Sequence, residues 1–310
     1  MKDEMILDRH GNRIRIFVKN DDGIRELTRS QLDFIIDKSI KKEPHLFIPY
    51  LLNIKDILKI LKSKNEKGSE IRKIVLRKML KMKKEPKYII LEMNNKRINL
   101  LYNISIFLVI RQIFLDDQYD THSSKIKGKV VIDVGANVGV FSIYTTIIGA
   151  KKVYAFEPVP ETYNILKKNI KLNNLENLII PINKGLGEKD ENKIIYFNSS
   201  GDIGATLNFS KLKYLKEKEN KINVLVTTLD KFIKQNKIPR VDFIKMDVEG
   251  YEENVLLGAK ETIKKWKPIL SFSAYHLPTD KERLPQIVKS IRPDYKIKLN
   301  KFAEEDFYCW

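Results

Sequence analysis

Residues 130–139, VVIDVGANVG, decide the fold of the second half of this chain. Their β-branched residues predict a buried strand, and the pattern after Gly139 predicts a helix. This order places backbone amides at the carboxyl end of a strand, where open α/β sheets bind their ligands. Gly135 and Gly139 allow a tight turn and let a ligand approach the backbone with no Cβ in the way. The stretch therefore predicts a ligand-binding loop, the simpler alternative being a plain turn between strand and helix.

Strand and helix patterns alternate from residue 129 to the end of the chain. Parallel strands joined by right-handed helical crossovers produce this rhythm. We expect strands at 130–134, 152–157, 178–182, 241–248, 268–274, 295–299 and 306–309, helices from 139, over 160–172 and 229–235 and up to 265, and a hairpin of 193–197 with 222–226. Together these patterns predict a doubly wound, mostly parallel α/β sheet of seven strands.

The first 118 residues show a different mixture of patterns. We expect, in order, a strand at 13–18, a helix at 28–40, two amphipathic helices between 54 and 78, a β-hairpin of 88–93 with 97–102, and a buried helix at 104–115. Asn94-Asn95-Lys96 is the turn signal of that hairpin. We therefore expect a mainly helical extension containing a β-hairpin over residues 1–118 and the α/β domain over residues 119–310.

Positive charge is concentrated in the extension. The chain has 58 basic and 40 acidic residues, a net charge of +18, and the stretch Lys55–Lys87 holds thirteen basic residues against four acids, or +9. A surface that binds a polyanion or a membrane would need such a stretch. Solvated helix faces, in a composition biased toward lysine, explain it equally simply. The charge alone does not decide between these interpretations.

The composition also excludes several classes of protein. One cysteine, Cys309, cannot form an internal disulfide, and with four histidines it leaves no thiolate-based zinc cluster. The chain has no apolar run of the roughly 20 residues that span a bilayer. Its N-terminus shows no apolar core of a secretory signal. We expect a cytoplasmic protein without a bound metal.

Two acids beside the predicted strand ends indicate what the loop binds. Asp133 ends the strand before the glycines, where its carboxylate faces a cationic group directly or through water. Glu157 ends the next strand, at the place where an acid accepts hydrogen bonds from ribose hydroxyls in doubly wound folds. The loop has the spacing Gly-x-x-x-Gly and not the G-x-G-x-x-G of dinucleotide sites. A cationic amino-acid nucleoside therefore fits better than a dinucleotide.

Four blocks in order make the pattern specific: VVIDVGANVGVFSIY, VYAFEPVPETYNILKKNIKLNN, VTTLDKFI and FIKMDVEGYEENVLLGA. Together they resemble the FkbM family of methyltransferases, from Gln118 to about His276. The resemblance implies a class I methyltransferase fold with a Rossmann-like sheet and S-adenosyl-L-methionine as the methyl donor. It also implies O-methylation of a sugar hydroxyl or another small-molecule oxygen as the reaction.

The resemblance also implies roles for individual residues. It assigns to the cofactor site Asp133, Gly135, Asn137 and Gly139 in the loop, Glu157 and Pro158 in the ribose-binding turn, and Leu186 beside the adenine. The usual polar partner of the adenine is not evident near Leu186. The glycine-bearing segment Gly201–Thr206 matches the family's loop before VTTLD, and we interpret it as a substrate loop or a plain turn.

The catalytic residues are expected at the end of the strand 241–248. Lys245, Asp247 and Glu249 would share one face if this strand persists, and they match the family's KxDxEG block. We expect Asp247 to act as a base or to orient the acceptor, and Glu249 to bind acceptor hydroxyls. The alternative is that both acids cap the next helix and pair with Lys245. His276, after the strand 268–274, is a further candidate for proton transfer.

Three hypotheses about function remain open at this point. The first is O-methylation of a sugar, glycan or other small molecule, with Asp247, Glu249 and His276 around the acceptor. The second is an RNA methyltransferase that uses the basic 55–87 region to bind phosphates. In tRNA guanosine methyltransferases an Asn-Leu-Pro-like motif stands at the place where this chain has KMDVEG, and this difference counts against the RNA hypothesis. The third is a nucleotide-binding protein without catalysis. The sequence does not indicate an oligomeric state.

Overall fold

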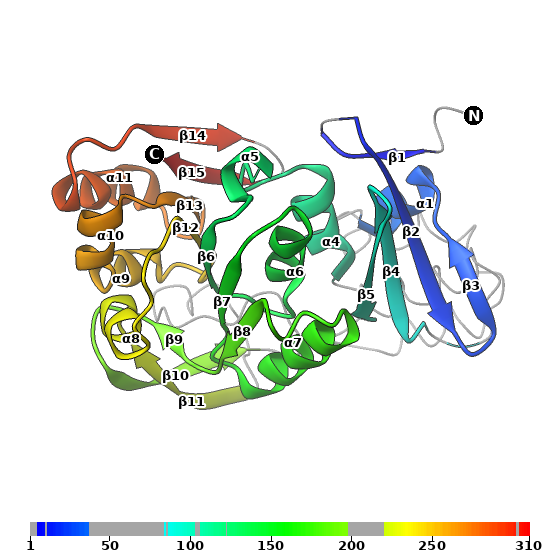
Figure 1. The fold of residues 1–310 in the computed structure, drawn as a ribbon, viewed down its shortest axis with the longest axis horizontal. Coiled ribbons are helices and arrows are strands. Elements are labelled where there is room, and N and C mark those ends of the chain that lie inside the picture. The colour runs from blue at the N-terminus through cyan, green and yellow to red at the C-terminus, as the bar shows by residue number, and fades with distance from the viewer. Residues whose placement is uncertain are drawn as a thin grey trace. The chain divides into compact units, whose positions relative to one another are not determined.

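A computed structural model describes residues 5–9, 11–36, 84, 86–102, 106–121, 123–197, 220–301 and 304–310 (Figure 1). The chain divides into two compact units, residues 1–111 and 112–310. Most of the basic stretch, its two predicted amphipathic helices and the predicted loop Gly201–Thr206 lie outside the described residues. No helix within the described ranges combines the length and apolar character needed to cross a membrane.

The first unit contains an antiparallel sheet in which β2 pairs with β1, β3 and β4, and β4 pairs with β5. Its elements are β1 (Ile6–Leu7), β2 (Arg13–Asn20), β3 (Gly23–Glu26), α1 (Arg29–Ile36), β4 (Tyr88–Met93), β5 (Lys96–Leu101) and α4 (Ile106–Ile110). In β2 the side chains of Ile14, Ile16 and Val18 are buried, as the alternation of the sequence predicts. Asn94 and Asn95 both have positive φ angles between β4 and β5, which suits a two-residue hairpin turn.

The second unit is built on a seven-stranded sheet with the order β14-β15-β13-β12-β6-β7-β8. Its strands are β6 (Val130–Val134), β7 (Lys152–Phe156), β8 (Ile179–Ile182), β12 (Phe243–Met246), β13 (Ile269–Ser273), β14 (Ile297–Lys301) and β15 (Glu305–Cys309). The five strands from β13 to β8 are parallel, and β15 and β14 add to one edge as antiparallel strands. The predicted α/β class and the mostly parallel sheet are confirmed.

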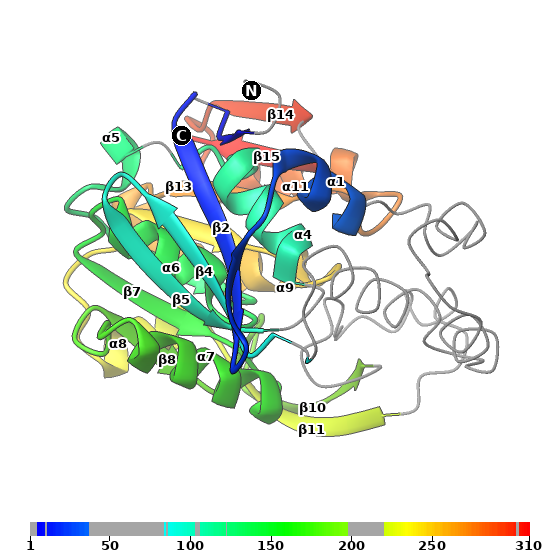
Figure 2. The same ribbon diagram turned by 90° about the vertical axis from the view of Figure 1, so that its right-hand side faces the viewer.

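Helices cover both faces of this sheet, as Figures 1 and 2 show. They are α5 (Ser123–Ile126), α6 (Val140–Ile147), α7 (Pro160–Leu172), α8 (Leu229–Gln235), α9 (Glu252–Leu257), α10 (Lys260–Trp266) and α11 (Asp280–Ile291). The central strand β6 is buried along its whole length. Its Ile132 packs in the main core with residues of α8 to α11, while the next residue, Asp133, turns toward Ser142 of α6. Burial on both faces explains why β6 is apolar throughout apart from Asp133.

A second, small sheet stands beside the main one. It has the order β10-β11-β9, from β9 (Gly185–Leu186), β10 (Glu191–Phe197) and β11 (Asn220–Thr227). The strands β10 and β11 correspond to the predicted hairpin of 193–197 with 222–226. Val159, Ile195, Val224 and Tyr251 pack together under this sheet. This packing ties the chain that leaves β7 to the chain that follows β12.

Two predicted elements have different boundaries in the structure. The helix expected to run to Lys265 is divided into α9 and α10. At the division the carbonyl oxygen of Gly258 accepts the backbone N–H of Asp230, and a Cβ at Gly258 would overlap the carbonyl oxygen of Gly187. Contacts with distant segments therefore accompany the break at this glycine. The helix expected over 104–115 consists, in its described part, of α4 followed by a π-helical turn at Arg111–Leu115.

Candidate active site

The turn from β6 into α6 is a tight loop of residues 135–139, which we call the glycine loop. Gly135 and Gly139 have φ angles of +74° and +92°, in the left-handed region that favours glycine. A Cβ added at Gly135 would overlap the backbone carbonyl oxygen of Asp247, which follows β12. Asn137 also has a positive φ and donates its backbone N–H to Glu157. The loop is therefore pressed directly against the end of the neighbouring strand.

Glu157 follows β7 and closes one side of the glycine loop. Its carboxylate is buried and accepts hydrogen bonds from the backbone N–H groups of Asn137, at 3.0 Å, and Val159, at 2.9 Å. Burial raises the pKa of Glu157 to about 7, although these two hydrogen bonds favour the ionised form. The structure thus brings together the loop residue Asn137 and the acid that the sequence placed beside it.

Asp133 and Lys245 form an ion pair beneath the loop. In the parallel register of β6 and β12 these residues are direct neighbours, and Lys245 Nζ lies 3.2 Å from Asp133 Oδ1. Lys245 also donates to the carbonyl oxygen of Gly135 at 2.9 Å, and Ser142 Oγ donates to Asp133 Oδ2 at 2.6 Å. Both charged side chains are almost completely buried, at 0% and 5% exposure. The pair therefore braces the glycine loop from inside the sheet.

This arrangement corrects the predicted alternation of three residues along one strand. The strand β12 ends at Met246, and Glu249 and Gly250 turn the chain with φ angles of +57° and +93°. Lys245 consequently points to Asp133 and not toward Glu249. The N-cap position of α9 is held by Tyr251, and neither Asp247 nor Glu249, the two acids of the alternative expectation, occupies it.

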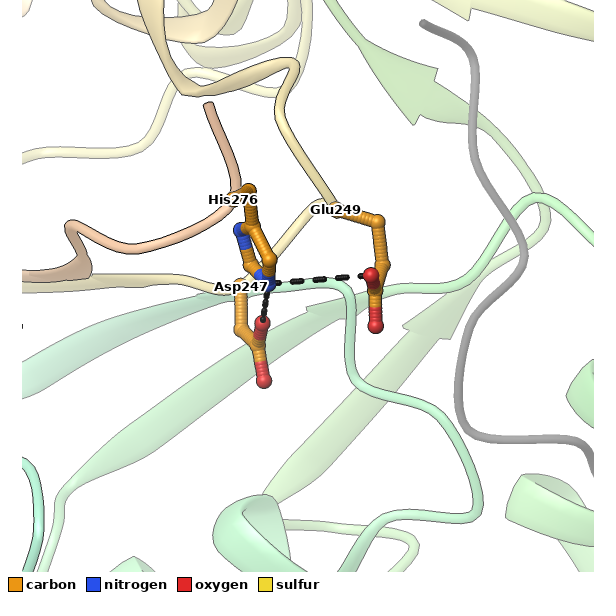
Figure 3. A group of neighbouring side chains, drawn as sticks. All are labelled: Asp247, Glu249 and His276. Carbon is orange, nitrogen blue, oxygen red and sulfur yellow. Dashed lines mark ion pairs between the residues drawn. The ribbon is translucent and has the colours of Figure 1, made fainter. Parts of the chain in front are cut away.

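Asp247, Glu249 and His276 nevertheless lie together at the carboxyl edge of the sheet (Figure 3). We call them the acid–histidine cluster. His276 Nε2 is 3.7 Å from Asp247 Oδ1 and 3.6 Å from Glu249 Oε2. One ligand atom from each of the three side chains lies within 4.8 Å of the others, so the cluster could hold a metal ion. The turn after β12 and the segment after β13 bring these residues together.

His276 is the most enclosed member of the acid–histidine cluster, with a side chain only 2% exposed. Its Nδ1 lies 3.0 Å from Oε1 of Glu252, which also accepts the backbone N–H of Val248. Burial lowers the pKa of His276, but the hydrogen bond and charge of Glu252 and the charges of Asp247 and Glu249 outweigh it and raise the pKa to about 9. In this state the imidazole carries a proton at neutral pH and is not itself a base.

Asp247 is held by two hydroxyl groups. Tyr119 Oη donates to its Oδ2 at 3.0 Å, and Ser273 Oγ donates to its Oδ1 at 3.2 Å. Burial opposes ionisation of Asp247, but the charges of Lys245 and His276 and these hydrogen bonds lower its pKa below the ordinary value. Asp247 is therefore a carboxylate at neutral pH, with a side chain 29% exposed.

Sequence patterns did not single out Tyr119, Ser273 or Glu252. Tyr119 belongs to Gln118-Tyr119-Asp120, where the family resemblance begins, and this was a usable signal. Glu252 lies three residues after Glu249, within the same block. Ser273 carries no signal, because only the pairing of β12 with β13 places its hydroxyl group beside Asp247.

The two other expected cofactor residues are Leu186, which is apolar and buried, and Pro158, which lies in the turn after Glu157. Leu186 is 2% exposed and belongs to the main apolar core. Pro158 follows Glu157, and the backbone carbonyls of both accept hydrogen bonds from the side-chain amide of Asn183, at 3.0 Å and 2.9 Å. Asn183 therefore fixes the turn that carries Glu157.

A comparison with known families identifies this arrangement. The sequence profile of the Methyltransferase FkbM domain matches residues 133–303, which include the glycine loop, Glu157 and the acid–histidine cluster. The chain belongs to the FkbM methyltransferase family. The family resemblance drawn from the four sequence blocks is thereby confirmed, and the match extends past His276 to the antiparallel edge of the sheet.

Other methyltransferase sequences match parts of this chain. Methyltransferase sdnD of Sordaria araneosa is 26% identical over 194 residues, 52% of this chain and 74% of that protein. The hexuronic acid methyltransferase AglP of Haloferax volcanii is 26% identical over 182 residues, 57% of this chain and 68% of that protein. The tRNA (guanine(37)-N(1))-methyltransferase Trm5b of Methanocaldococcus jannaschii is 51% identical, but over only 61 residues, 20% of this chain and 18% of that protein.

Proposed function

We propose that this FkbM methyltransferase transfers a methyl group from S-adenosyl-L-methionine to a hydroxyl group of a sugar, a sugar acid or another small molecule. The contact between Gly135 and the carbonyl group of Asp247 carries the proposal. It joins the loop assigned to the donor and the edge assigned to the acceptor with no residue between them. Methyl transfer requires this closeness, because the acceptor oxygen must lie in line with the methyl carbon.

The residues around the glycine loop suit the donor. The buried carboxylate of Glu157 stands at a strand end, where ribose hydroxyls donate hydrogen bonds in doubly wound folds. Gly135 lets the loop approach the carbonyl oxygen of Asp247, which fills the space of a Cβ, and Lys245 and Asp133 support the loop from below. When bound, S-adenosyl-L-methionine supplies a methyl group on a positively charged sulfonium centre. Pro158 and Leu186 complete the expected donor site.

The acid–histidine cluster suits a hydroxyl acceptor. Asp247 and Glu249 are positioned to accept hydrogen bonds from hydroxyl groups of the acceptor, and Asp247 is already ionised. In the reaction the acceptor oxygen bonds to the methyl carbon as the carbon–sulfur bond breaks, and that electron pair stays on sulfur. The hydroxyl proton passes to the carboxylate of Asp247. The nearby His276 stabilises both carboxylates through its charge.

The relatives support a sugar-like acceptor over RNA. AglP, which the alignment covers for 68% of its length, is a hexuronic acid methyltransferase. The similarity to the tRNA methyltransferase Trm5b covers only 20% of this chain. Short regions of this kind are shared when two enzymes bind the same donor, and they say little about the acceptor.

Methyl transfer with a radioactive donor tests the acceptor class. Purified protein is incubated with an extract of its source cells and methyl-labelled S-adenosyl-L-methionine, and the products are separated with and without nuclease treatment. We expect label in nuclease-resistant sugar-containing or small-molecule material, and less of it with Glu157→Ala when the donor is below saturation. Label that disappears on nuclease treatment would contradict the proposed acceptor, and the absence of donor binding in calorimetry would contradict the donor.

A further inference from the structure

We propose that Asp247, Glu249 and His276 form a binding site for one divalent cation, with Mn²⁺ preferred over Mg²⁺. The observation that points to a ligand is the imidazole of His276. Its side chain is only 2% exposed, and within the described residues its Nε2 atom has no hydrogen-bond partner. Figure 3 shows this atom directed between the two carboxylates. A buried nitrogen aimed at two acids without bonding to either indicates that something else belongs between them.

The distances fit a shared ion better than a direct contact. Hydrogen bonds from nitrogen to oxygen span about 2.7–3.2 Å, and Nε2 is 3.7 Å and 3.6 Å from the two carboxylate oxygens. Ligands of an octahedral ion at about 2.1 Å lie roughly 3.0 Å apart when adjacent and roughly 4.2 Å apart when opposite. The observed separations fall between these two values. Small side-chain rotations would therefore complete the coordination.

Glu252 prepares His276 for this role. Its Oε1 lies 3.0 Å from Nδ1 of His276, whereas Asp247 and Glu249 approach the other ring nitrogen, Nε2. Metal-binding histidines commonly donate their other ring N–H to a carboxylate, which fixes the ring orientation and increases the basicity of the metal-binding nitrogen. Glu252 is 1% exposed and is itself anchored by the backbone N–H of Val248. The second nitrogen is thus held toward the cluster, and it would release its proton to solvent when an ion binds.

Charge gives an independent reason for a cation. Asp247, Glu249 and Glu252 bring three carboxylates around one imidazole, and the neighbouring Lys245 is already paired with Asp133. These three carboxylates carry more negative charge than one protonated imidazole offsets. Carboxylate ligands suit Mg²⁺ and Mn²⁺, while an imidazole ligand favours transition metals, so the mixed set favours Mn²⁺.

The cation would also activate the acceptor, and this part rests on the proposed function. An aliphatic hydroxyl is a weak acid, and a carboxylate such as that of Asp247 is a weak base toward it. A hydroxyl oxygen that completes the coordination of the ion loses its proton to water more easily. The alkoxide would attack the methyl carbon as the carbon–sulfur bond breaks and its electron pair stays on sulfur. With the ion bound, Asp247 would act as a ligand and water would take the proton, whereas without the ion Asp247 takes the proton directly, as proposed above.

Electron paramagnetic resonance of Mn²⁺ tests the site directly, because the signal of the free ion decreases when the ion binds. The full-length protein, stripped with chelator, is titrated with MnCl₂ alone, and MgCl₂ is then added as a competitor. We expect one Mn²⁺ per chain. Glu249→Gln and His276→Gln should each weaken binding at least tenfold. Glu252→Gln should weaken it about 10- to 100-fold through the orientation of His276.

Glu253→Gln is the matched control. Glu253 lies in α9 next to Glu252, but its carboxylate pairs with Arg283 on the surface. We expect it to bind Mn²⁺ within twofold of the unchanged protein. Glu249→Gln removes a partly exposed carboxylate in a turn, so it tests the site even if His276→Gln does not fold. The proposal is overturned if the unchanged protein does not bind Mn²⁺, or if Glu249→Gln and a folded His276→Gln bind it as tightly as Glu253→Gln.

Donor binding in the same samples separates this inference from the proposed function. Calorimetry with S-adenosyl-L-methionine needs no metal and no acceptor. Donor binding without Mn²⁺ binding would refute the cation site and leave the methyltransferase proposal intact. Mn²⁺ binding with the expected variant pattern but without donor binding would refute the methyltransferase proposal and leave the cation site intact.

Discussion

The glycine loop and the acid–histidine cluster follow neighbouring strands, yet their charged side chains differ in how they are hydrogen-bonded and paired. Beside the loop, Glu157 accepts two backbone hydrogen bonds, and Asp133 is held by Ser142 and Lys245 at 0% exposure. In the cluster, Nε2 of His276 lies 3.6–3.7 Å from its two acids and has no hydrogen bond among the described residues. In the first region the protein's own groups hold both carboxylates, with Asp133 Oδ1 kept by its ion pair with Lys245 and no hydrogen bond. The second region, by our inference, receives a partner from outside.

This difference matches the chemistry proposed for each region. A donor that is the same in every turnover is best met by a rigid, preorganised pocket. An acceptor region must instead hold a polar molecule, and an ion if our inference is correct, so its charges cannot all be neutralised from within. The comparison predicts that changes beside the loop affect stability and donor binding, while changes in the cluster affect cation binding and transfer.

The largest effect is expected for Lys245→Met. Removal of one partner of a buried ion pair leaves the other charge uncompensated and typically costs about 3–5 kcal/mol. Lys129→Met is the control, because Lys129 is 42% exposed and lies 3.9 Å from Asp242, a surface pair worth about 0–1 kcal/mol. Urea denaturation measures both free energies of unfolding. Similar losses in the two variants would show that Lys245 and Asp133 do not brace the loop.

A pair of glycine substitutions tests the close contact between the two regions. Gly135 and Gly128 have nearly the same φ, +74° and +75°, but a Cβ at Gly128 meets nothing within 4 Å. Gly128→Ala should therefore lower the free energy of unfolding only by the cost of placing alanine in the left-handed conformation, about 1–2 kcal/mol. Gly135→Ala should lower it by roughly 1–3 kcal/mol more, because the added Cβ overpacks against Asp247. Equal changes in thermal unfolding would contradict the contact.

Glu157→Ala tests the donor side alone. Loss of the hydrogen bonds to ribose should weaken binding of S-adenosyl-L-methionine by about 1–3 kcal/mol, or roughly 5- to 150-fold. Glu161→Ala, an exposed acid in the first turn of α7, should bind the donor as the unchanged protein does. Isothermal titration calorimetry provides the comparison. Equal affinities for the two variants would remove Glu157 from the donor site.

The smallest expected effect is a dependence on pH. The folded-state pKa of Glu157 is about 7, above its ordinary 4.5, so the stability it contributes is complete below pH 4.5 and is lost as pH rises through 7. Donor binding should change in the opposite direction, because ribose hydroxyls donate to the ionised form. We expect affinity to rise up to about tenfold from pH 6 to pH 8. Glu157→Gln should show a flat profile, and a slope retained in that variant would assign it to another group.

Much of the second unit could be predicted from local patterns. Regular spacing placed α7 at Pro160–Leu172 and α8 at Leu229–Gln235, the ranges they have in the structure. Where the patterns failed, a contact with a distant segment or a local turn intervened. Gly258 meets the backbone of Gly187 at the division between α9 and α10, and β12 ends at Met246, ahead of the turn at Glu249 and Gly250. Local periodicity cannot register the first constraint, since Gly187 is remote in the sequence.

The sequence by itself determined the family, the order of strands and helices, and the residue types at the strand ends. Those features depend on neighbours in the chain: β-branched runs, glycines at turns, and acids that follow strands. Only the tertiary structure decided which charged side chains pair with one another. The parallel register of β12 with β6 sends Lys245 to Asp133, and the turn after β12 sends Asp247 and Glu249 to His276. Charge pairing acts through space over a few ångströms, so it is fixed when the strands assemble and not before.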